Sequence, residues 1–175
     1  RRGAAWEEAK KHAALVGGVA LPKKPFGHAM AAGLSARNNP AMAACLSQDE
    51  VWYEASIYTK HPATGLAIKC KPDVYLPNTG TLIDLKTTAS AEPYNFTRSC
   101  HKFAYHLQAA FYRMVCREAG LRVNSFFNFI AVEKVPPYAA QHFVMEDDLL
   151  SFAEQRVEQI LLEIAHSRET GEFST

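Results

Sequence analysis

The segment Thr81–Lys86 reads TLIDLK, and one turn before it the segment Gly65–Asp73 reads GLAIKCKPD. Both segments are rich in aliphatic residues, and the turn residues PNTG between them predict two neighbouring antiparallel strands. Side chains alternate between the two faces of a strand, so Asp84 and Lys86 are expected to share one face. An acid and an amine therefore stand side by side on an otherwise apolar strand, which we expect to lie inside a sheet.

These residue types suit one kind of chemistry. If the turn pairs the two strands, the carboxyl groups of Asp73 and Asp84 converge with the amine of Lys86. Carboxylate oxygens are ligands for Mg²⁺, with Mn²⁺ as a substitute, and such a cation acidifies water and neutralises charge on a phosphate. Lys86 would orient or deprotonate that water and hold the phosphate. The pattern predicts a metal-dependent nuclease with these three residues as its catalytic signature and the two acids as metal ligands.

An isolated D-x-K pattern is weak evidence, because an acid and a base two residues apart are often merely solvated on an exposed strand face. Here the pattern interrupts an apolar strand, and Asp73 lies one hairpin earlier. A third acid, Glu54, lies on the preceding expected strand. Several carboxylates on adjacent strands favour a site.

The hydrophobic pattern along the chain predicts the fold. Ala-rich and amphipathic segments ended by glycine or proline predict helices, and runs rich in β-branched and aromatic residues predict strands. This order indicates an α/β domain with a central mixed β-sheet flanked by helices. Helices are expected at Trp6–Val16, Phe26–Arg37, Ala41–Leu46, around Pro93–Ser99, at Lys102–Ala119 and from Asp147, and strands at Val51–Thr59, Leu66–Leu76, Thr81–Lys86, Val123–Glu133 and Ala139–Met145.

Composition limits the classes of protein. A chain of 175 residues is long enough for one well-buried domain, expected to span residues 1–175. The 19 basic residues nearly balance the 18 acidic ones, so any surface for nucleic acid must be local. The four cysteines form no C-x-x-C pair and are expected to be reduced thiols. No apolar run reaches the roughly 20 residues that span a membrane, so a cytoplasmic protein is expected.

Three segments together resemble the core of RecE-type (exonuclease VIII) nucleases of the PD-(D/E)XK superfamily. They are Gly65–Asp73, Leu82–Thr88 and Tyr105–Tyr112, which contain Pro-Asp, D-x-K and Q-x-x-x-Y in that order. Each motif is weak alone, but the ordered combination is specific. The resemblance extends from about Trp6 to the last helix. It implies a restriction-endonuclease-like PD-(D/E)XK core, with the catalytic core within residues 49–112.

The resemblance also implies roles for further residues. The main-chain carbonyl of Leu85 would be a metal ligand beside Asp73 and Asp84. Glu54 matches an acid that binds the metal directly or through water. Gln108 and Tyr112 lie four residues apart on one helix face and would shape the active site. The alternative for this pair is a buried amide and phenol satisfied by the sheet.

One part of the family pattern is missing. These nucleases have an upstream helix with a metal-binding histidine, and the chain begins at Arg1, after the place where that helix would lie. His28 occupies the wrong position and is interpreted as a surface or helix-start residue. Two interpretations stay open: the 175 residues are a C-terminal fragment of a longer chain, or the metal site is incomplete.

The resemblance implies a Mg²⁺-dependent 5′ to 3′ exonuclease on double-stranded DNA ends that acts in phage-type recombination. It further implies a ring-like homo-oligomer and a single-strand annealing protein as partner. The alternatives are an endonuclease or RecB-like nuclease module, and a non-catalytic DNA-binding domain that has lost its metal site. Basic residues near the expected site are candidates for contacts with DNA phosphates, although several could be ordinary solvated charges. They are Lys69, Lys71, Arg98, Lys102 and Arg113.

Overall fold

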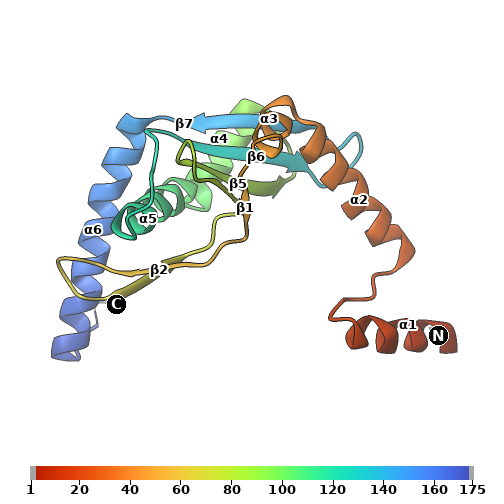
Figure 1. Cartoon of the computed structure of the whole chain (residues 1–175), viewed down its shortest axis with the longest axis horizontal. Coiled ribbons are helices and arrows are strands. Elements are labelled where there is room, and N and C mark those ends of the chain that lie inside the picture. Colours follow the sequence, from red (N-terminus) through yellow and green to blue (C-terminus); the bar gives the residue numbers. More distant parts are fainter. Residues whose placement is uncertain (1–2, 174–175) are drawn as a thin grey trace.

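A computed structural model describes residues 3–173 of the chain. It contains a five-stranded mixed sheet with helices on both faces and a separate two-stranded sheet (Figure 1), which confirms the predicted α/β class. The helices are α1 (Ala4–Leu15), α2 (Lys23–Asn38), α3 (Pro40–Leu46), α4 (Pro93–Lys102), α5 (Tyr105–Glu118) and α6 (Asp147–Thr170). The strands are β1 (Trp52–Tyr53), β2 (Ile57–Lys60), β3 (Ala67–Cys70), β4 (Val74–Leu76), β5 (Thr81–Thr88), β6 (Phe127–Glu133) and β7 (Ala140–Met145).

The main sheet has the strand order β1-β4-β5-β6-β7. Strands β5 and β6 run parallel, whereas the other neighbouring pairs are antiparallel. A parallel pair needs a long crossover connection, and α4 and α5 provide it. The predicted mixed sheet is therefore confirmed, although the strand expected from Val123 begins only at Phe127.

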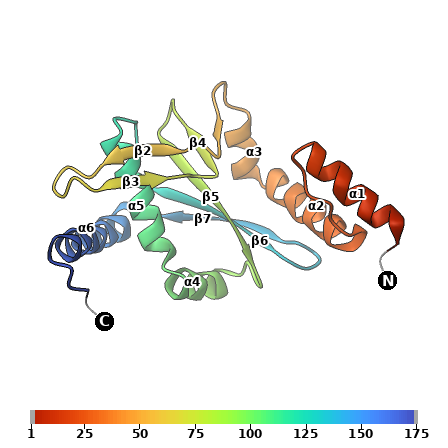
Figure 2. The same cartoon turned by 90° about the horizontal axis from the view of Figure 1, so that it is seen from below.

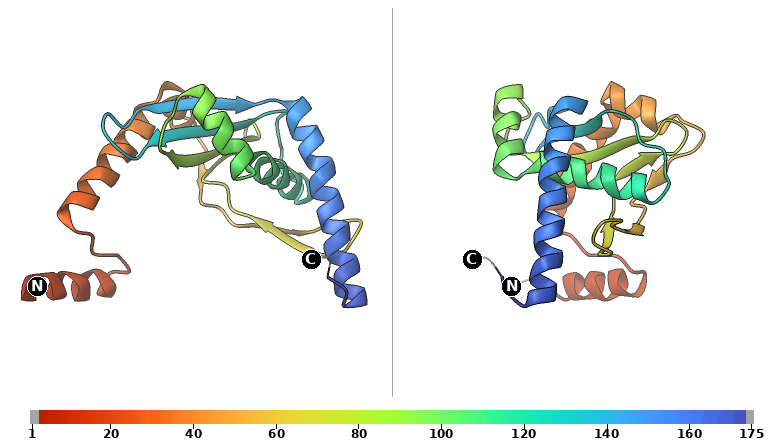
Figure 3. Two further views of the ribbon diagram at one scale, coloured as in Figure 1. Left: turned by 180° about the vertical axis from the view of Figure 1, so that it is seen from behind. Right: turned by 90° about the vertical axis from the view of Figure 1, so that its left-hand side faces the viewer.

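Two hydrophobic clusters lie on opposite faces of this sheet. One face packs against α5 and α6 through residues that include Leu82. The other packs against α2 and α3 through residues that include Ile83. Helices α2 and α3 lie in front of the sheet in Figure 1, and α4 and α5 come to the front in the view from behind in Figure 3. Because both faces of β5 are covered at Leu82 and Ile83, this part of the strand is apolar on both sides.

The expected hairpin between Val51–Thr59 and Leu66–Leu76 forms, but each of its arms is broken. The outer halves pair as β2 and β3, and the inner halves continue as β1 and β4 in the main sheet. Glu54 lies at the first break with φ of 50°, in the left-handed region, which ends the extended conformation. The prediction of two continuous strands was wrong, because the two halves of each arm belong to different sheets. Figure 2 shows the two-stranded sheet beside α5 and α6.

The helix expected at Lys102–Ala119 begins at Tyr105 instead. Helix α4 runs through Lys102, and Ala104 has φ of 53°, so the chain turns sharply before α5. Phe103, which falls within the expected helix, lies in this turn and is 57% exposed. No glycine or proline marks the turn, and for that reason the sequence pattern did not show it.

Helix α1 is set apart from the sheet in Figure 1, and none of its residues is buried. In the described part of the chain, no helix combines the length and apolar composition required to cross a membrane.

Candidate active site

The pairing of β4 with β5 brings the two predicted acids together. Val74 lies opposite Ile83, so Asp73 directly precedes the paired segment. Its Oδ2 accepts a hydrogen bond of 2.6 Å from the backbone N–H of Leu85. This bond holds the Asp73 carboxylate against β5, next to Asp84.

Lys86 is held between a strand and a helix. Its Nζ donates a hydrogen bond of 2.7 Å to Oε1 of Gln108 and lies 2.6 Å from Oδ2 of Asp84. The Gln108 Nε2 in turn donates to Oδ1 of Asp84 at 2.9 Å. The side chains of Lys86 and Asp84 are only 15% and 6% exposed, so these contacts lie in a largely water-excluded place. The three side chains close a ring of contacts that joins β5 to α5.

Two aromatic rings lie beside the same ammonium group. The Nζ of Lys86 lies 4.4 Å from the ring centroid of Tyr105 and 6.0 Å from that of Phe129. Such positions are favourable because the negative face of a ring attracts a cation. The sequence did not indicate a role for Tyr105, since only the turn before α5 places it beside Lys86.

Glu54 lies beside Asp73, and its side chain interacts mainly with Lys71 and to a smaller extent with Asp73. Its backbone N–H donates to the carbonyl of Asp73 at 3.1 Å, and its side chain forms an ion pair with Lys71. The carboxylate is 59% exposed. Lys71 lowers the pKa of Glu54 through a hydrogen bond and its charge. Glu54 is therefore an ionised, solvated neighbour of the two inner acids.

Burial disfavours the ionised forms of both inner acids. It raises the pKa of Asp73 to about 6, with a smaller contribution from the charges of Asp84 and Glu54 that the hydrogen bond from Leu85 opposes. Burial also raises the pKa of Asp84, although Lys86 and Gln108 both act to lower it. The negative charge at this point is thus incompletely compensated by the protein, which favours the approach of a cation.

The oxygen atoms present fit a small divalent cation in part. Within residues 3–173, no three His, Cys, Asp or Glu side chains are grouped closely enough to hold a metal ion. Two carboxylates and the main-chain carbonyl of Leu85 remain, and Mg²⁺ needs only one or two carboxylates because it keeps several waters. The buried Oδ2 of Asp84 lies 2.6 Å from the Lys86 ammonium and has no further polar partner among residues 3–173.

Tyr112 lies one helical turn beyond Gln108, at the inner side of α5. Burial raises the pKa of its hydroxyl, and Gln108 partly offsets this effect. Its ring lies 6.5 Å from that of Phe127, in the core beneath the sheet. The predicted pair therefore stays together: Gln108 contacts Lys86 and Asp84 directly, and the hydroxyl of Tyr112 contacts Gln108.

The predicted basic residues lie in different places. Lys69 is exposed on β3, and Lys71 pairs with Glu54. Arg98 and Lys102 lie on α4 and line a hollow. Arg113 is buried, and its Nη2 lies 3.0 Å from Oδ1 of Asp147 on α6. The guanidinium of Arg113 is thus buried and engaged in the contact between α5 and α6.

A second hollow of about 480 Å³ opens beside the acids on the α2 face. Glu54, Asp73 and Leu85 line it together with Arg37, at the end of α2. Nothing in the sequence pattern distinguished Arg37 from other basic residues. Only the packing of α2 against the sheet brings it to the site.

Residues 37–175 match a protein family described as a PDDEXK-like domain of unknown function (DUF3799). The chain belongs to this family. The matched range contains β4, β5 and α5, and so includes Asp73, Asp84, Lys86 and Gln108. The expected PD-(D/E)XK class is confirmed at this level. No curated protein matches the chain significantly.

Several solved structures align with the chain. A crystal structure from Eubacterium rectale described as a "Putative exonuclease" aligns with a TM-score of 0.64 and 19% identity, over 81% of this chain and 54% of that one. The chain thus spans about half the length of that protein. A phage related exonuclease from Haemophilus somnus aligns with a TM-score of 0.44 and 12% identity, over 91% and 83% of the two chains. An alkaline exonuclease from Laribacter hongkongensis has a TM-score of 0.36 and 15% identity, over 98% and 89%.

Proposed function

We propose that this protein is a divalent-cation-dependent nuclease that hydrolyses DNA phosphodiesters. The observation that carries the proposal is the position of Lys86, whose ammonium is held by Asp84 and Gln108 next to the strand that bears Asp73. One buried acid, one half-buried acid and one restrained amine, on β5 and directly before β4, form a set suited to phosphoryl chemistry. Membership in a PDDEXK-like family supports the same proposal.

Asp73, Asp84 and the carbonyl of Leu85 would hold the cation. When bound, Mg²⁺ or Mn²⁺ lowers the pKa of water and neutralises the charge that grows on the phosphate. The ammonium of Lys86 donates to the phosphate or to the attacking water. Gln108 keeps that ammonium in place with its Oε1, and the rings of Tyr105 and Phe129 limit the access of bulk water.

The finer proposal is a 5′ to 3′ exonuclease on double-stranded DNA ends, of the RecE type, that acts in phage-type recombination. A ring-like homo-oligomer and a single-strand annealing partner belong to the same proposal. The ordered Pro-Asp, D-x-K and Q-x-x-x-Y motifs support it. The names of the exonucleases that share the fold are consistent with it.

The test is digestion of linear duplex DNA, labelled at either the 5′ or the 3′ end, in the presence of Mg²⁺. The intact chain is compared with Lys86→Ala, with Lys86→Arg, which keeps the positive charge, and with Lys60→Ala, which removes an exposed lysine from β2. We expect the chain and Lys60→Ala to release mononucleotides from 5′ ends. Both Lys86 variants should lose about a hundredfold or more in rate, because arginine cannot reproduce the geometry or release a proton. Equal digestion by Lys86→Ala would defeat the proposal.

Two alternatives have their own outcomes. Nicking of closed circular DNA, with no preference for ends, would assign an endonuclease or a RecB-like module. A non-catalytic domain is favoured by one observation, the lack of a third grouped acid or histidine in residues 3–173. Absence of both digestion and Mn²⁺ binding would assign that function.

A further inference from the structure

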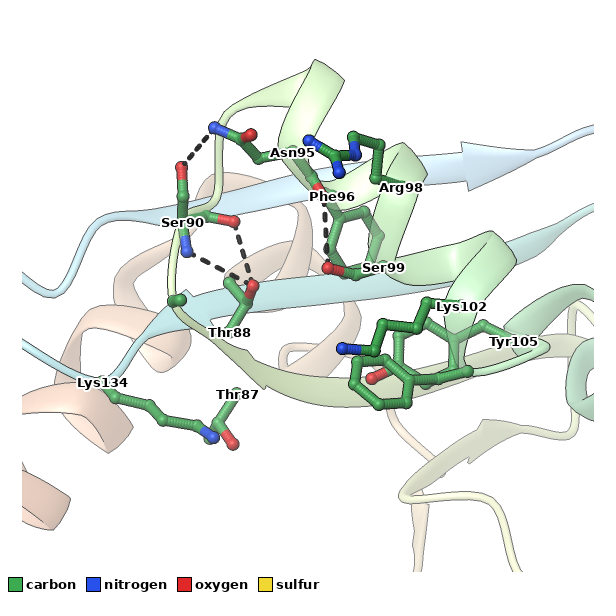
Figure 4. Close-up of a pocket in the computed structure, with 12 residues that line it drawn as sticks. Thr87, Thr88, Ser90, Asn95, Phe96, Arg98, Ser99, Lys102, Tyr105 and Lys134 are labelled. Atoms are coloured by element: carbon green, nitrogen blue, oxygen red, sulfur yellow. Dashed lines mark hydrogen bonds between the residues drawn. The ribbon is translucent and has the colours of Figure 1, made fainter.

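A hollow of about 570 Å³ lies between the end of β5 and α4 (Figure 4). We call it the basic groove and define it by the residues that the argument uses. They are Thr87, Ser90, Arg98, Lys102, Phe103 and Lys134.

The groove concentrates positive charge in a nearly neutral chain. Its lining contains Arg98, Lys102 and Lys134 and no acidic residue, whereas the whole chain has a net charge of only +1. Among the ion pairs of residues 3–173, none involves these three cations. Their charges are therefore free to act on an anion.

The groove is continuous with the active site. Thr87 follows Lys86 on β5, and Tyr105, whose ring lies 4.4 Å from the Nζ of Lys86, also lines the groove. The far end lies near Thr88, whose carbonyl accepts from the N–H of Lys134 at 3.1 Å. Two residues along a strand span about 7 Å, close to the rise of two nucleotides in one DNA strand. The groove thus lies where the next phosphates of a strand held at Lys86 would pass.

Hydrogen bonds hold the wall of the groove in shape. The Thr88 hydroxyl donates to the carbonyl of Ser90 at 3.0 Å, and Asn95 Nδ2 donates to Ser90 Oγ at 3.2 Å (Figure 4). These contacts tie the loop after β5 to the start of α4. The groove is therefore a formed feature of the fold.

An exposed ring marks the edge of the groove. Phe103 is 57% exposed, and its ring stacks on Tyr105 with centroids 5.7 Å apart. Lys102 Nζ lies 5.4 Å from the Phe103 ring centroid. Cations beside an exposed aromatic face are typical of surfaces that bind single strands, because unpaired bases stack on the ring. In duplex DNA the base faces are hidden inside the helix.

We propose that the basic groove binds a single strand of DNA, with its phosphates on Arg98, Lys102 and Lys134 and a base on Phe103. This inference rests on the proposed function in that the bound strand is the one that passes Lys86. It adds that the duplex is separated at the site and that the groove carries the unpaired strand without reading its sequence.

The test measures binding by fluorescence anisotropy in EDTA, so it does not depend on hydrolysis. The probes are labelled oligothymidine of about 12 nucleotides and a blunt duplex of the same length. The intact chain is compared with Lys102→Ala/Lys134→Ala, with Phe103→Ala, and with the matched control Lys10→Ala/Lys11→Ala on α1.

We expect Lys102→Ala/Lys134→Ala to bind the single strand at least about tenfold more weakly, and the slope of log affinity against log salt to fall by about 1.4. Phe103→Ala should weaken single-strand binding about tenfold. The control should bind like the intact chain. Unchanged binding by the groove variants, an equal loss in the control, or tighter binding of the duplex than of the single strand would overturn the inference. Digestion lost in Lys86→Ala tests the catalytic proposal separately, because the two proposals fail in different assays.

Discussion

The ammonium of Lys86 lies 2.7 Å from Oε1 of Gln108, although the two residues are 22 positions apart and lie on different elements. The same amide donates to Asp84 at 2.9 Å. One side chain of α5 therefore orients both the acid and the amine of β5. This contact ties the geometry of the proposed active site to the docking of a helix.

Gln108 is expected to act as a positioning residue. In Gln108→Leu both hydrogen bonds are lost, and DNA hydrolysis should fall about ten- to a hundredfold with little change in KM, because Lys86 is no longer held. Gln108→Glu keeps an acceptor for Lys86 but replaces the amide donor with a carboxylate that repels Asp84, so it should also be slow. Rates at saturating DNA equal to that of the intact chain in both variants would argue against this role.

Removing Lys86 should destabilise the metal-free protein at neutral pH. Lys86→Met leaves the buried Asp84 carboxylate without its counter-charge, at a cost of about 3 kcal/mol in the free energy of unfolding. The cost should shrink at acidic pH, where Asp84 becomes neutral. Urea denaturation at pH 8 and pH 4 measures both values, with the exposed Lys60→Met as control. A loss of equal size at both pH values would contradict the explanation.

Asp73 is expected to destabilise the protein when it is ionised. Its pKa is raised to about 6 in the folded state, so the folded protein binds more protons than the unfolded one between the ordinary value and pH 6. Stability therefore falls as the pH rises through this interval. Asp73→Asn removes the charge and should stabilise the metal-free chain by about 1 kcal/mol at pH 7.5, since half-exposure screens much of the effect. At pH 3.5 it should give no gain in thermal denaturation, and a gain of the same size there would refute the assignment.

Mg²⁺ or Mn²⁺ should stabilise the folded chain. At about one hundred times Kd, binding to the folded state alone adds about 2.7 kcal/mol, which chelation by EDTA should remove. Asp84→Asn and Asp73→Asn should lose this gain, because each removes a charged ligand. Glu8→Gln, on α1, should keep it. Calorimetric titration and thermal denaturation provide the measurement, and an unchanged response in Asp84→Asn would exclude this acid as a ligand.

Arg113 is expected to be dispensable for both folding stability and DNA binding. Its side chain is 8% exposed, and within residues 3–173 its Nε and Nη1 have no hydrogen-bond partner, although Nη1 lies 3.8 Å from Oε1 of Glu154, so burial of its charge is incompletely compensated. Arg113→Met should therefore change the free energy of unfolding by less than about 1 kcal/mol, or increase it, because Asp147 is half-exposed and can be hydrated. DNA binding should remain that of the intact chain. Weaker DNA binding by a fully folded Arg113→Met would restore this residue as a DNA contact.

Local sequence patterns were sufficient to predict most of the helices and strands. The apolar run around Asp84 predicted a strand covered on both faces, and a proline, Pro40, marked the break between α2 and α3, where the side chain of Asn39 caps α3. The exceptions are the break at Glu54 and the turn at Ala104, both non-glycine residues with positive φ. Packing imposes these conformations against local preference, so no local pattern could predict them.

The order of residues along the chain determined that Asp84 and Lys86 share one face of a strand, because alternation follows from backbone geometry alone. It also placed Asp73 one turn away from them. Tertiary structure alone decided that Gln108 and Tyr105 reach Lys86, that Arg113 turns inward to α6, and that a basic groove continues from the site. These relationships depend on how α4, α5 and α6 pack on the sheet, and packing is a property of surfaces far apart in the sequence.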